Sequence, residues 1–435
     1  MISSLIAKVH GRRVWDSRGR PTVEAEVLLQ GGAFGRAIAP AGASTGSGEA
    51  IDLRDQNSRH GGSDVLRAVE NVNIEIARAL SEKNAFDQAN IDRILIELDG
   101  TPNKARLGGN ATVAVSMAVL QAAAAASQKP IYEYLLDGRE PVMPLPEIQI
   151  FGGGSHAARR VDIQDFMIVA PKAGSFAEAL EWTAEVYRAA HDLMSETGRL
   201  SGVADEGGFW PTFESNEATL DALMTSIARA GFTPGDEIAI ALDIASSEFH
   251  RDGRYHLTLD DRALDTDAMI ELLIGWIDRY PIVSIEDPLS EHDAAGLVAF
   301  TKAVGNRVQI VGDDFLVTNA ARVRRAVEAG ACNAVLIKPN QAGTITEAHA
   351  AFEAAREAGW GTIVSARSGE TEDVTIVHLA VGWGAPQFKV GSFSRSERMA
   401  KWNEMLRIEE RLGQGTRFAG VEALTRSSAA LVSER

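Results

Sequence analysis

The sequence predicts an α/β protein in which a small α+β domain precedes a larger β/α barrel. In residues 1–137 predicted strands come first and helices follow, whereas in residues 138–435 apolar runs alternate with amphipathic helical segments. The apolar runs of the second part are rich in Val and Ile, which is typical of parallel strands buried on both faces. Several of these runs end in a charged residue, and functional side chains of β/α barrels lie where the strands end.

The first domain, residues 1–137, opens with strands. Residues 23–29 alternate apolar and polar side chains as a half-buried antiparallel strand does, and residues 33–38 form the expected partner strand. Helices are predicted near residues 63–80, 87–98 and 110–127. Because strands and helices are segregated along the chain, we expect an α+β arrangement.

The second domain, residues 138–435, is expected to form a closed barrel. Its predicted strands are residues 238–242, 282–285, 308–311, 334–337, 362–364 and 388–390. Segments of helical composition between them include residues 266–280, 320–330 and 346–359. So many strand–helix repeats favour a closed barrel over an open sheet. No GxGxxG fingerprint of a dinucleotide-binding fold follows a strand.

Composition and charge restrict the expected partners. Hydrophobic residues make up 45% of the chain and charged residues 24%, as in ordinary globular proteins. The formal net charge of −17 repels polyphosphate backbones, so nucleic acid is not an expected partner. A small anionic acid can still bind where a local cluster of Lys, Arg or metal outweighs the repulsion from the net negative charge of the chain.

The expected location of the protein is the cytoplasm, with no membrane partner. Residues 1–8 contain too few apolar side chains for a signal peptide. The most apolar window, residues 111–127, is interrupted by Ser116 and Gln121 and predicts a helix packed inside the protein rather than a bilayer span. The single cysteine, Cys332, excludes an intrachain disulfide and is expected to be a core residue in a reducing compartment.

The residues that end the apolar runs change from acidic to basic along the chain. They are Asp243, Glu286 with Asp287, Asp313 with Asp314, Lys338, Arg367 with Ser368, and Lys389. Carboxylates from three successive strands would converge and repel one another unless a cation neutralised them. Ligation by oxygen alone suits Mg²⁺. The alternative is a purely structural ring of ion pairs.

The cationic strand ends predict acid–base chemistry. Lys338 and Lys389 would face each other, and like charges disfavour the protonated form, so Lys338 could act as a general base near neutral pH. Arg367 offers a fork for phosphate or carboxylate. Together with a metal, these groups indicate proton abstraction beside a carboxylate, with the ion stabilising the enediolate that forms. The alternative for Lys338 is a solvated lysine at a strand end.

Two glycine-bounded loops supply further candidates. Glu206, in the segment Ala204–Gly208, is a candidate acid if a group leaves from the neighbouring carbon, although such composition is also common in turns. The loop of small residues 41–48 is either a flexible surface loop or a mobile lid that approaches a ligand. His156 is a further loop residue that could be catalytic or structural.

These motifs resemble the enolase family over nearly the whole chain. The most specific matches are Gly42–Gly46, Asp205–Gly208, Leu242–Phe249, Ser284–Pro288, Ser368–Asp373 and Arg395–Arg398. The resemblance implies an N-terminal α+β domain and an enolase-type barrel whose opening elements depart from simple parallel alternation. It also implies a hydro-lyase that removes water from a 2-phosphoglycerate-like acid, and a homodimer or higher homo-oligomer.

The resemblance also implies a role for individual residues. Asp243, Glu286 and Asp313 would hold one Mg²⁺, and Ser44 would join a second Mg²⁺ that arrives with the substrate. Lys338 would be the base and Glu206 the acid that helps hydroxide to leave. The remaining substrate-binding positions implied are His156, Gln164, Arg367, Ser368 and Lys389.

The sequence departs from the family pattern mainly on the substrate side. Ala366 stands where enolases carry His, and Asp165 where they carry Glu. Arg159 and Arg160 occupy a stretch that is normally glycine-rich. Further replacements are Arg20, Ala204, Phe209 and Trp210. We therefore expect Asp165, Arg159 and Arg160 to contact a substrate with an extra anionic group, phosphorylated or phosphonylated, as in a relative similar to carboxyphosphonoenolpyruvate synthase of phosphinate antibiotic biosynthesis.

Two alternatives remain open from the sequence. In the first, Arg159 and Arg160 point to solvent and the protein is a glycolytic enolase that converts 2-phosphoglycerate to phosphoenolpyruvate. In the second, the chain is a non-catalytic binding or structural protein on an enolase scaffold. Such a protein would be expected to lose Lys338, Glu206 or a metal carboxylate, and all are present.

Overall fold

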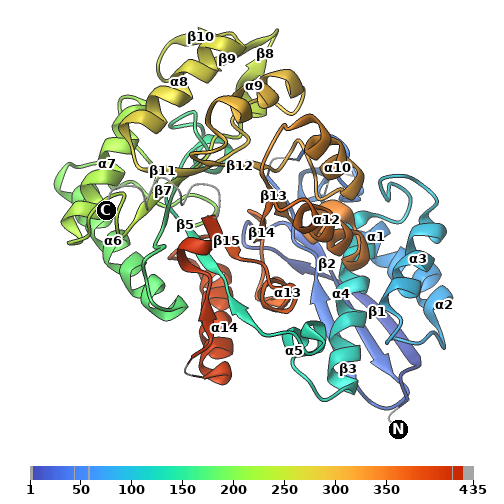
Figure 1. Ribbon diagram of the computed structural model, residues 1–435. Coiled ribbons are helices and arrows are strands. Elements are labelled where there is room, and N and C mark those ends of the chain that lie inside the picture. Colours follow the sequence, from blue (N-terminus) through green and yellow to red (C-terminus); the bar gives the residue numbers. More distant parts are fainter. Residues whose placement is uncertain (1–2, 44, 57–58, 414, 425–435) are drawn as a thin grey trace.

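The computed structural model describes residues 3–43, 45–56, 59–413 and 415–424. Ser44, the residue expected to join a second metal ion, lies outside the described residues. An N-terminal unit with a three-stranded sheet lies beside a larger barrel surrounded by helices (Figure 1). The predicted fold class, an α+β domain followed by a β/α barrel, is confirmed.

The N-terminal sheet is antiparallel, with β1 (Ile6–Trp15), β2 (Pro21–Leu29) and β3 (Phe34–Ile38) in that order. Helix α4 (Gly109–Ala126) packs across β2 and β3. Gly35 permits this approach, because a Cβ atom there would lie 2.1 Å from the backbone oxygen of Ala118. Although α4 is long and apolar enough to cross a membrane, 89% of it is buried inside the protein, as the sequence predicted.

The remaining helices of this unit lie close to the predicted segments. They are α1 (Leu66–Asn71), a π-helical turn (Val72–Ile76), α2 (Ala77–Leu80) and α3 (Gln88–Asp99). A further short helix, α5 (Ile131–Leu136), was not predicted. Asp87 begins α3, because its side chain accepts a hydrogen bond from the backbone N–H of Asn90. Strand β1 was not predicted, since its sequence alternates only partly between apolar and polar residues.

The barrel closes through eight strands in the order β11-β12-β13-β14-β15-β5-β6-β7. Their bounds are β5 (Leu145–Gly152), β6 (Asp165–Val169), β7 (Ala239–Asp243), β11 (Ile282–Glu286), β12 (Gln309–Gly312), β13 (Ala334–Ile337), β14 (Gly361–Ser365) and β15 (Gln387–Ser392). Strand β6 runs antiparallel to both neighbours, whereas the other pairs are parallel. This is the departure from parallel alternation that the resemblance implied.

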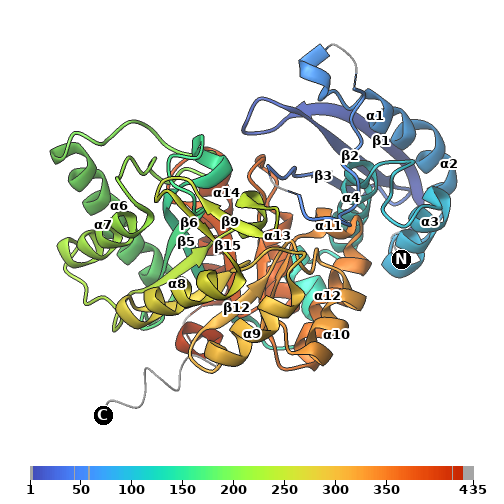
Figure 2. The same cartoon turned by 90° about the horizontal axis from the view of Figure 1, so that it is seen from above.

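Helices surround the barrel (Figure 2). They are α6 (Phe176–Glu196), α7 (Asn216–Arg229), α8 (Thr266–Arg279), α9 (Ala294–Val304), α10 (Ala320–Ala329), α11 (Pro339–Ala342), α12 (Ile345–Glu357), α13 (Thr375–Trp383) and α14 (Ser396–Leu412). Smaller strands are β4 (Val142–Met143), β8 (His250–Arg251), β9 (Arg254–Leu257), β10 (Arg262–Leu264) and β16 (Arg417–Phe418). Cys332 is buried, as predicted.

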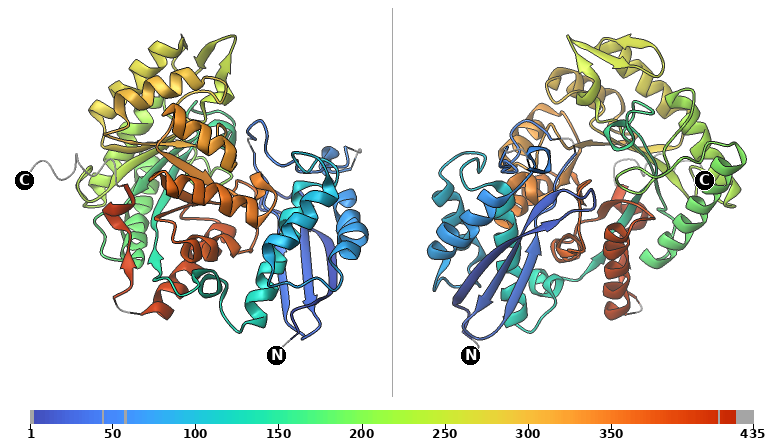
Figure 3. Two further views of the ribbon diagram at one scale, coloured as in Figure 1. Left: turned by 45° about the vertical axis from the view of Figure 1, so that its right-hand side comes forward. Right: turned by 180° about the vertical axis from the view of Figure 1, so that it is seen from behind.

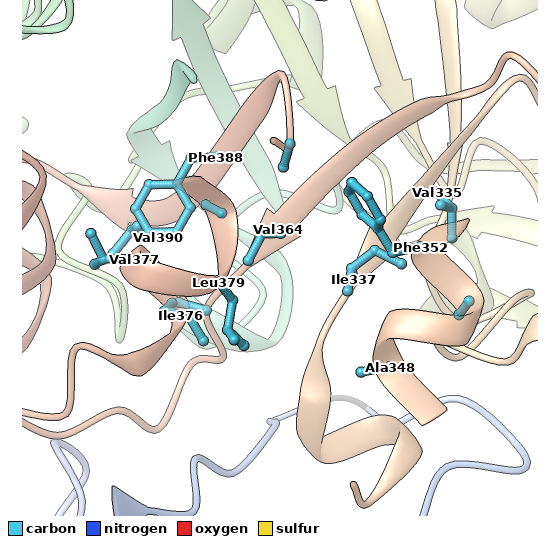
Figure 4. Packing of buried hydrophobic residues seen from close by; sticks show 14 of the residues in the cluster. Val335, Ile337, Ala348, Phe352, Val364, Ile376, Val377, Leu379, Phe388 and Val390 are labelled. Atoms are coloured by element: carbon cyan, nitrogen blue, oxygen red, sulfur yellow. The ribbon is translucent and has the colours of Figure 1, made fainter. Parts of the chain in front are cut away.

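Side-chain alternation along β13 aims Lys338 into the barrel. Val335 and Ile337 belong to the layer between strands and helices, where Figure 4 shows them beside Phe352 of α12. Ala334 and Leu336 point the other way and belong to an apolar cluster inside the barrel. Because successive side chains of a strand alternate between its faces, the next residue, Lys338, follows Leu336 toward the barrel interior.

The N-terminal unit contributes a loop to the end of the barrel. Its helices α3 and α4 lie against α11 and α12 on one side of the barrel (Figure 3). Ala41 and Gly369 exchange two backbone hydrogen bonds of 2.9 Å each. The backbone N–H of Ala43 donates to Oγ of Ser368 at 2.7 Å. These bonds bring the loop of small residues predicted above to the ends of the barrel strands.

Candidate active site

A small buried cavity at the carboxyl ends of the barrel strands brings most of the predicted site residues together. Those that line it are His156, Gln164, Asp165, Glu206, Asp243, Lys338, Arg367, Ser368 and Lys389. Ala43 from the N-terminal loop and Ala366 complete part of the wall. Residues from both units and from distant parts of the barrel sequence therefore face one space.

Lys389 joins carboxylates from three strands. Its Nζ lies 2.7 Å from Oε2 of Glu286, 3.1 Å from Oδ2 of Asp243 and 3.5 Å from Oδ2 of Asp165. Burial alone would lower the pKa of Lys389, but Asp243 and Glu286 outweigh it and hold the pKa well above its usual range. The pKa of Glu286 is raised by burial and by the nearby charge of Asp243. A ring of ion pairs is thus part of this site.

Lys338 is buried and pairs with Asp313. Its Nζ donates to Oδ2 of Asp313, and Nε2 of Gln341 donates to the other carboxylate oxygen at 2.9 Å. Burial lowers the pKa of Lys338 while Asp313 raises it, and the net shift is upward. The proximity of Lys389 is therefore not sufficient to bring the pKa of Lys338 down toward neutral. Lys389 does lower it, but the carboxylate of Asp313 has the stronger influence.

The carboxylates fit a hard divalent ion. Asp243, Glu286 and Asp313 supply only oxygen, and Oε1 of Glu286 is buried with no hydrogen-bond partner in the described part of the chain. Asp287, Asp313 and Asp314 also form a cluster whose oxygens lie within 4.8 Å of one another. We favour the first set, because both oxygens of Asp287 already accept 2.9 Å hydrogen bonds from the backbone of residues 313 and 314.

Two further carboxyl groups of the cavity, Asp165 and Glu206, differ in proton affinity. Burial raises the pKa of Asp165 to about 6. The pKa of Glu206 is lowered, because His156 and neighbouring cations outweigh its burial. Nε2 of His156 lies 4.0 Å from Oε1 of Glu206. Of these two carboxylates, Asp165 therefore takes up a proton first.

Gln149, which was not among the predicted site residues, connects Asp165 to the loop that carries Glu206. Its Nε2 donates to Asp165, and its Oε1 accepts from the backbone N–H of Gly208 at 2.8 Å, next to the loop that carries Glu206. The signal in the sequence that could have identified Gln149 was its polar side chain within the largely apolar strand β5. The same residue, together with Glu147, interrupts the apolar pattern of β5 and explains why that strand was not predicted.

Arg367 is held from two directions. Its Nη1 and Nη2 donate to the carboxylate of Glu49 at 3.0 and 3.3 Å. Arg398, which is fully buried, donates to the backbone oxygens of Arg367 at 2.6 Å and Ser368 at 2.5 Å. Glu49 and Arg398 were not among the predicted site residues. Arg398 lies in a motif that carried the family resemblance, whereas nothing in the sequence around Glu49 indicates its partner.

Arg159 and Arg160 do not line the cavity in this structure. Nη2 of Arg159 pairs with Oε2 of Glu248 at 2.6 Å, and the arginine side chain is 52% exposed. The guanidinium of Arg160 lies 5.7 Å from the centre of the Trp210 ring. Their assignment to substrate binding remains a prediction.

Glu147 carries a buried charge whose effect on stability can be measured. Burial raises its pKa from 4.5 to about 7, and its Oε2 has no hydrogen-bond partner within the described residues. A raised carboxyl pKa contributes stability below the unfolded-state pKa, and this contribution is lost as the pH rises through the folded-state pKa. The free energy of unfolding should therefore fall between pH 4.5 and 7 because of this group.

We predict that Glu147→Gln, which cannot ionise, removes this fall. Relative to the variant, the wild type should lose about 3 kcal/mol of stability over that interval, since each pKa unit corresponds to about 1.4 kcal/mol. Urea unfolding at several pH values measures the difference, with Glu97→Gln on exposed α3 as the matched loss of a carboxylate. An offset between Glu147→Gln and wild type that does not change with pH would contradict the prediction.

Comparison with known families agrees with the geometry. A family model described as "Enolase, N-terminal domain" matches residues 6–135, and one described as "Enolase, C-terminal TIM barrel domain" matches residues 140–427. These two matches span nearly the whole sequence. The chain belongs to the enolase family.

Proposed function

We propose that the protein is a Mg²⁺-dependent hydro-lyase that removes water from a 2-phosphoglycerate-like acid. The observation that carries this proposal is the meeting of Lys338, Glu206 and Arg367 in one buried cavity beside three carboxylates suited to a metal. Asp243, Glu286 and Asp313 would hold the ion. Bound Mg²⁺ would supply positive charge against the negative charge that develops on the substrate carboxylate.

Each protein group then has a defined task. Lys338 removes the proton from the carbon next to the carboxylate, and the electrons of that C–H bond pass into the carboxylate as an enediolate. In the next step these electrons form the new double bond as the neighbouring C–O bond breaks. Glu206 gives a proton to the departing oxygen, so that water leaves. Asp165, which takes up a proton more readily, is a second carboxyl group from which that proton can come. Arg367 binds the phosphate or phosphonate.

Before it can accept a proton, Lys338 must be neutral. Burial, Arg367 and Lys389 all lower its pKa, whereas Asp313 and Glu286 raise it. Neutralising those two carboxylates removes the influences that favour the charged lysine. The residues around Lys338 are therefore arranged so that the charge of the carboxylates decides whether it can act as a base.

For the substrate, we propose an analogue of 2-phosphoglycerate that carries an extra anionic group. The supporting observation is Ala366, whose small side chain lines the cavity directly beside Arg367. Extra volume at the phosphate end suits a larger substituent. The product would be an enolpyruvate derivative, as in carboxyphosphonoenolpyruvate synthase.

Ordinary glycolytic enolase is the second candidate, and the placement of the two added arginines favours it. Arg159 is engaged by Glu248 and Arg160 lies against Trp210, so neither offers its charge to the cavity. An extra anionic group would then lack the partners that the sequence suggested for it.

A substrate panel separates the two candidates. Purified protein with Mg²⁺ should turn over the phosphonoformyl analogue with a larger kcat/KM than 2-phosphoglycerate if the specialised assignment is correct. Turnover of 2-phosphoglycerate in the usual enolase range of kcat, with no preference for the analogue, would support the glycolytic assignment. If the protein turned over neither acid, the proposed reaction would be wrong.

A further inference from the structure

Glu49 of the N-terminal unit is a buried partner of Arg367. Besides the two guanidinium nitrogens, its Oε1 accepts from the backbone N–H of Gly46 at 3.0 Å and from Nε2 of Gln341 at 3.3 Å. Its side chain is 7% exposed. One carboxylate therefore joins the glycine-containing loop, helix α11 and Arg367, which lies two residues after β14.

This pairing determines how the guanidinium of Arg367 lies. An ionised carboxylate is costly to bury unless donors surround it, and Glu49 accepts hydrogen bonds at both oxygens. Two parallel N–H···O bonds fix the plane of a guanidinium as well as its position. The direction in which Arg367 faces the cavity thus depends on Glu49.

Glu49 also connects to the base through two intervening side chains, Gln341 and Asp313. Gln341, which donates to Glu49, donates to Oδ1 of Asp313 at 2.9 Å, and Asp313 accepts from Lys338 through its other oxygen. Oγ1 of Thr318 donates to Oε1 of Gln341 at 2.6 Å and fixes which way the amide points. The anion-binding group and the base therefore share one buried network.

We propose that Glu49 is a positioning residue that orients Arg367 toward the anionic group of the substrate and, through Gln341, orients Asp313 beside Lys338. The proposal rests on the proposed function, in which Arg367 binds that group. Glu49 itself makes no bond to the reacting atoms.

The opposite possibility is that the substrate anion displaces Glu49 from Arg367. Displacement would break the bonds from Gly46 and Gln341 as well as those from Arg367. Leaving several buried donors without an acceptor is unfavourable, so retention of Glu49 is the better explanation. The two possibilities predict opposite effects of neutralising Glu49 on anion affinity.

A barrel carboxylate that contacts the same loop, Glu291, provides a matched control. Oε2 of Glu291 accepts from the backbone N–H of Ser47 at 2.9 Å and from its Oγ at 2.5 Å. Glu291 holds the loop to the barrel as Glu49 does, and it makes no ion pair with Arg367 in the described structure. Glu291→Gln therefore reports on loop attachment without a change at Arg367.

The test is calorimetric titration of inorganic phosphate into full-length protein in the presence of Mg²⁺. Wild-type binding should disappear in Arg367→Met, which identifies the site. Glu49→Gln should weaken binding about tenfold, because one well-placed charge-assisted bond lost from the guanidinium corresponds to that change, whereas Glu291→Gln should stay within about twofold. Glu49→Asp, which keeps the charge but shortens the side chain, should also weaken binding and serves if Glu49→Gln does not fold.

Three results would overturn the proposal. They are tighter phosphate binding by Glu49→Gln, equal weakening by Glu291→Gln, or wild-type phosphate binding that does not depend on Arg367. In steady-state kinetics Glu49→Gln should raise KM and also lower kcat, since both Arg367 and Asp313 lose orientation. Arg367-dependent phosphate binding by a wild type that turns over neither acid would instead overturn the proposed function, and the Glu49 variants would still decide the positioning role.

Discussion

Lys338→Ala should lose at least about 10³-fold in kcat, within the range that a positioned general base contributes. The reason is that Lys338 lines the same cavity as Arg367 and is held there by its pair with Asp313. Product formation under saturating substrate and Mg²⁺ measures the loss. A variant that retained wild-type kcat would contradict the assignment.

Lys104→Ala is the matched control for this substitution. Lys104 is a second buried lysine whose Nζ pairs with a carboxylate, Glu347, at 2.6 Å, but it lies outside the cavity with Lys338. Its removal should lower the melting temperature, because it leaves Glu347 without its partner, and should leave kcat within a few-fold of wild type. Thermal unfolding of both variants separates loss of chemistry from loss of fold.

Removal of divalent ions should abolish turnover, and added Mg²⁺ should restore it. Without a cation, Asp243, Glu286 and Asp313 keep their pairs with Lys389 and Lys338, and Lys338 stays protonated. Chelator treatment followed by Mg²⁺ titration measures the effect. Full activity after complete chelation would show that the carboxylates serve only as an ion-pair ring.

Two variants at neighbouring positions test which carboxylates bind the ion. One changes Glu286, the last residue of β11, and the other changes Asp287, which follows it. Glu286→Gln should weaken Mg²⁺ binding about tenfold or more, since it removes a charged ligand with an unpaired oxygen. Asp287→Asn should mainly lower stability, because Asp287 holds the backbone of residues 313 and 314. If Asp287→Asn had the larger effect on Mg²⁺ affinity, the cluster Asp287, Asp313 and Asp314 would be the metal site instead.

Local patterns in the sequence were sufficient to predict the strands that carry the chemistry. The predicted barrel strands agree with the structure within two residues at each end. Alternation along β13 also places Lys338 inside the barrel, because Val335 and Ile337 must face the helices. Strands β5 and β6 were not predicted. In β5, Glu147 and Gln149 place polar side chains where an apolar run was sought, whereas β6 contains an apolar run, residues 166–169, that was overlooked.

Contacts between distant residues could not be predicted in the same way. The pairing of Arg367 with Glu49 spans 318 positions and depends on how the N-terminal unit lies against the barrel. The raised pKa of Lys338 depends on the balance between burial, Asp313 and Arg367, which composition does not reveal. The pairing of Arg159 with Glu248 could not be predicted either, because a long side chain on an exposed loop can reach several partners.

The most direct test of the central claim is exchange of the substrate's C2 proton with solvent deuterium, followed by NMR. In Glu206→Gln, where Lys338 is retained and the acid is lost, the C2 proton should exchange although little product forms. In Lys338→Ala exchange should be absent even with substrate and Mg²⁺ bound. Exchange by Lys338→Ala at the wild-type rate would show that another group removes the proton.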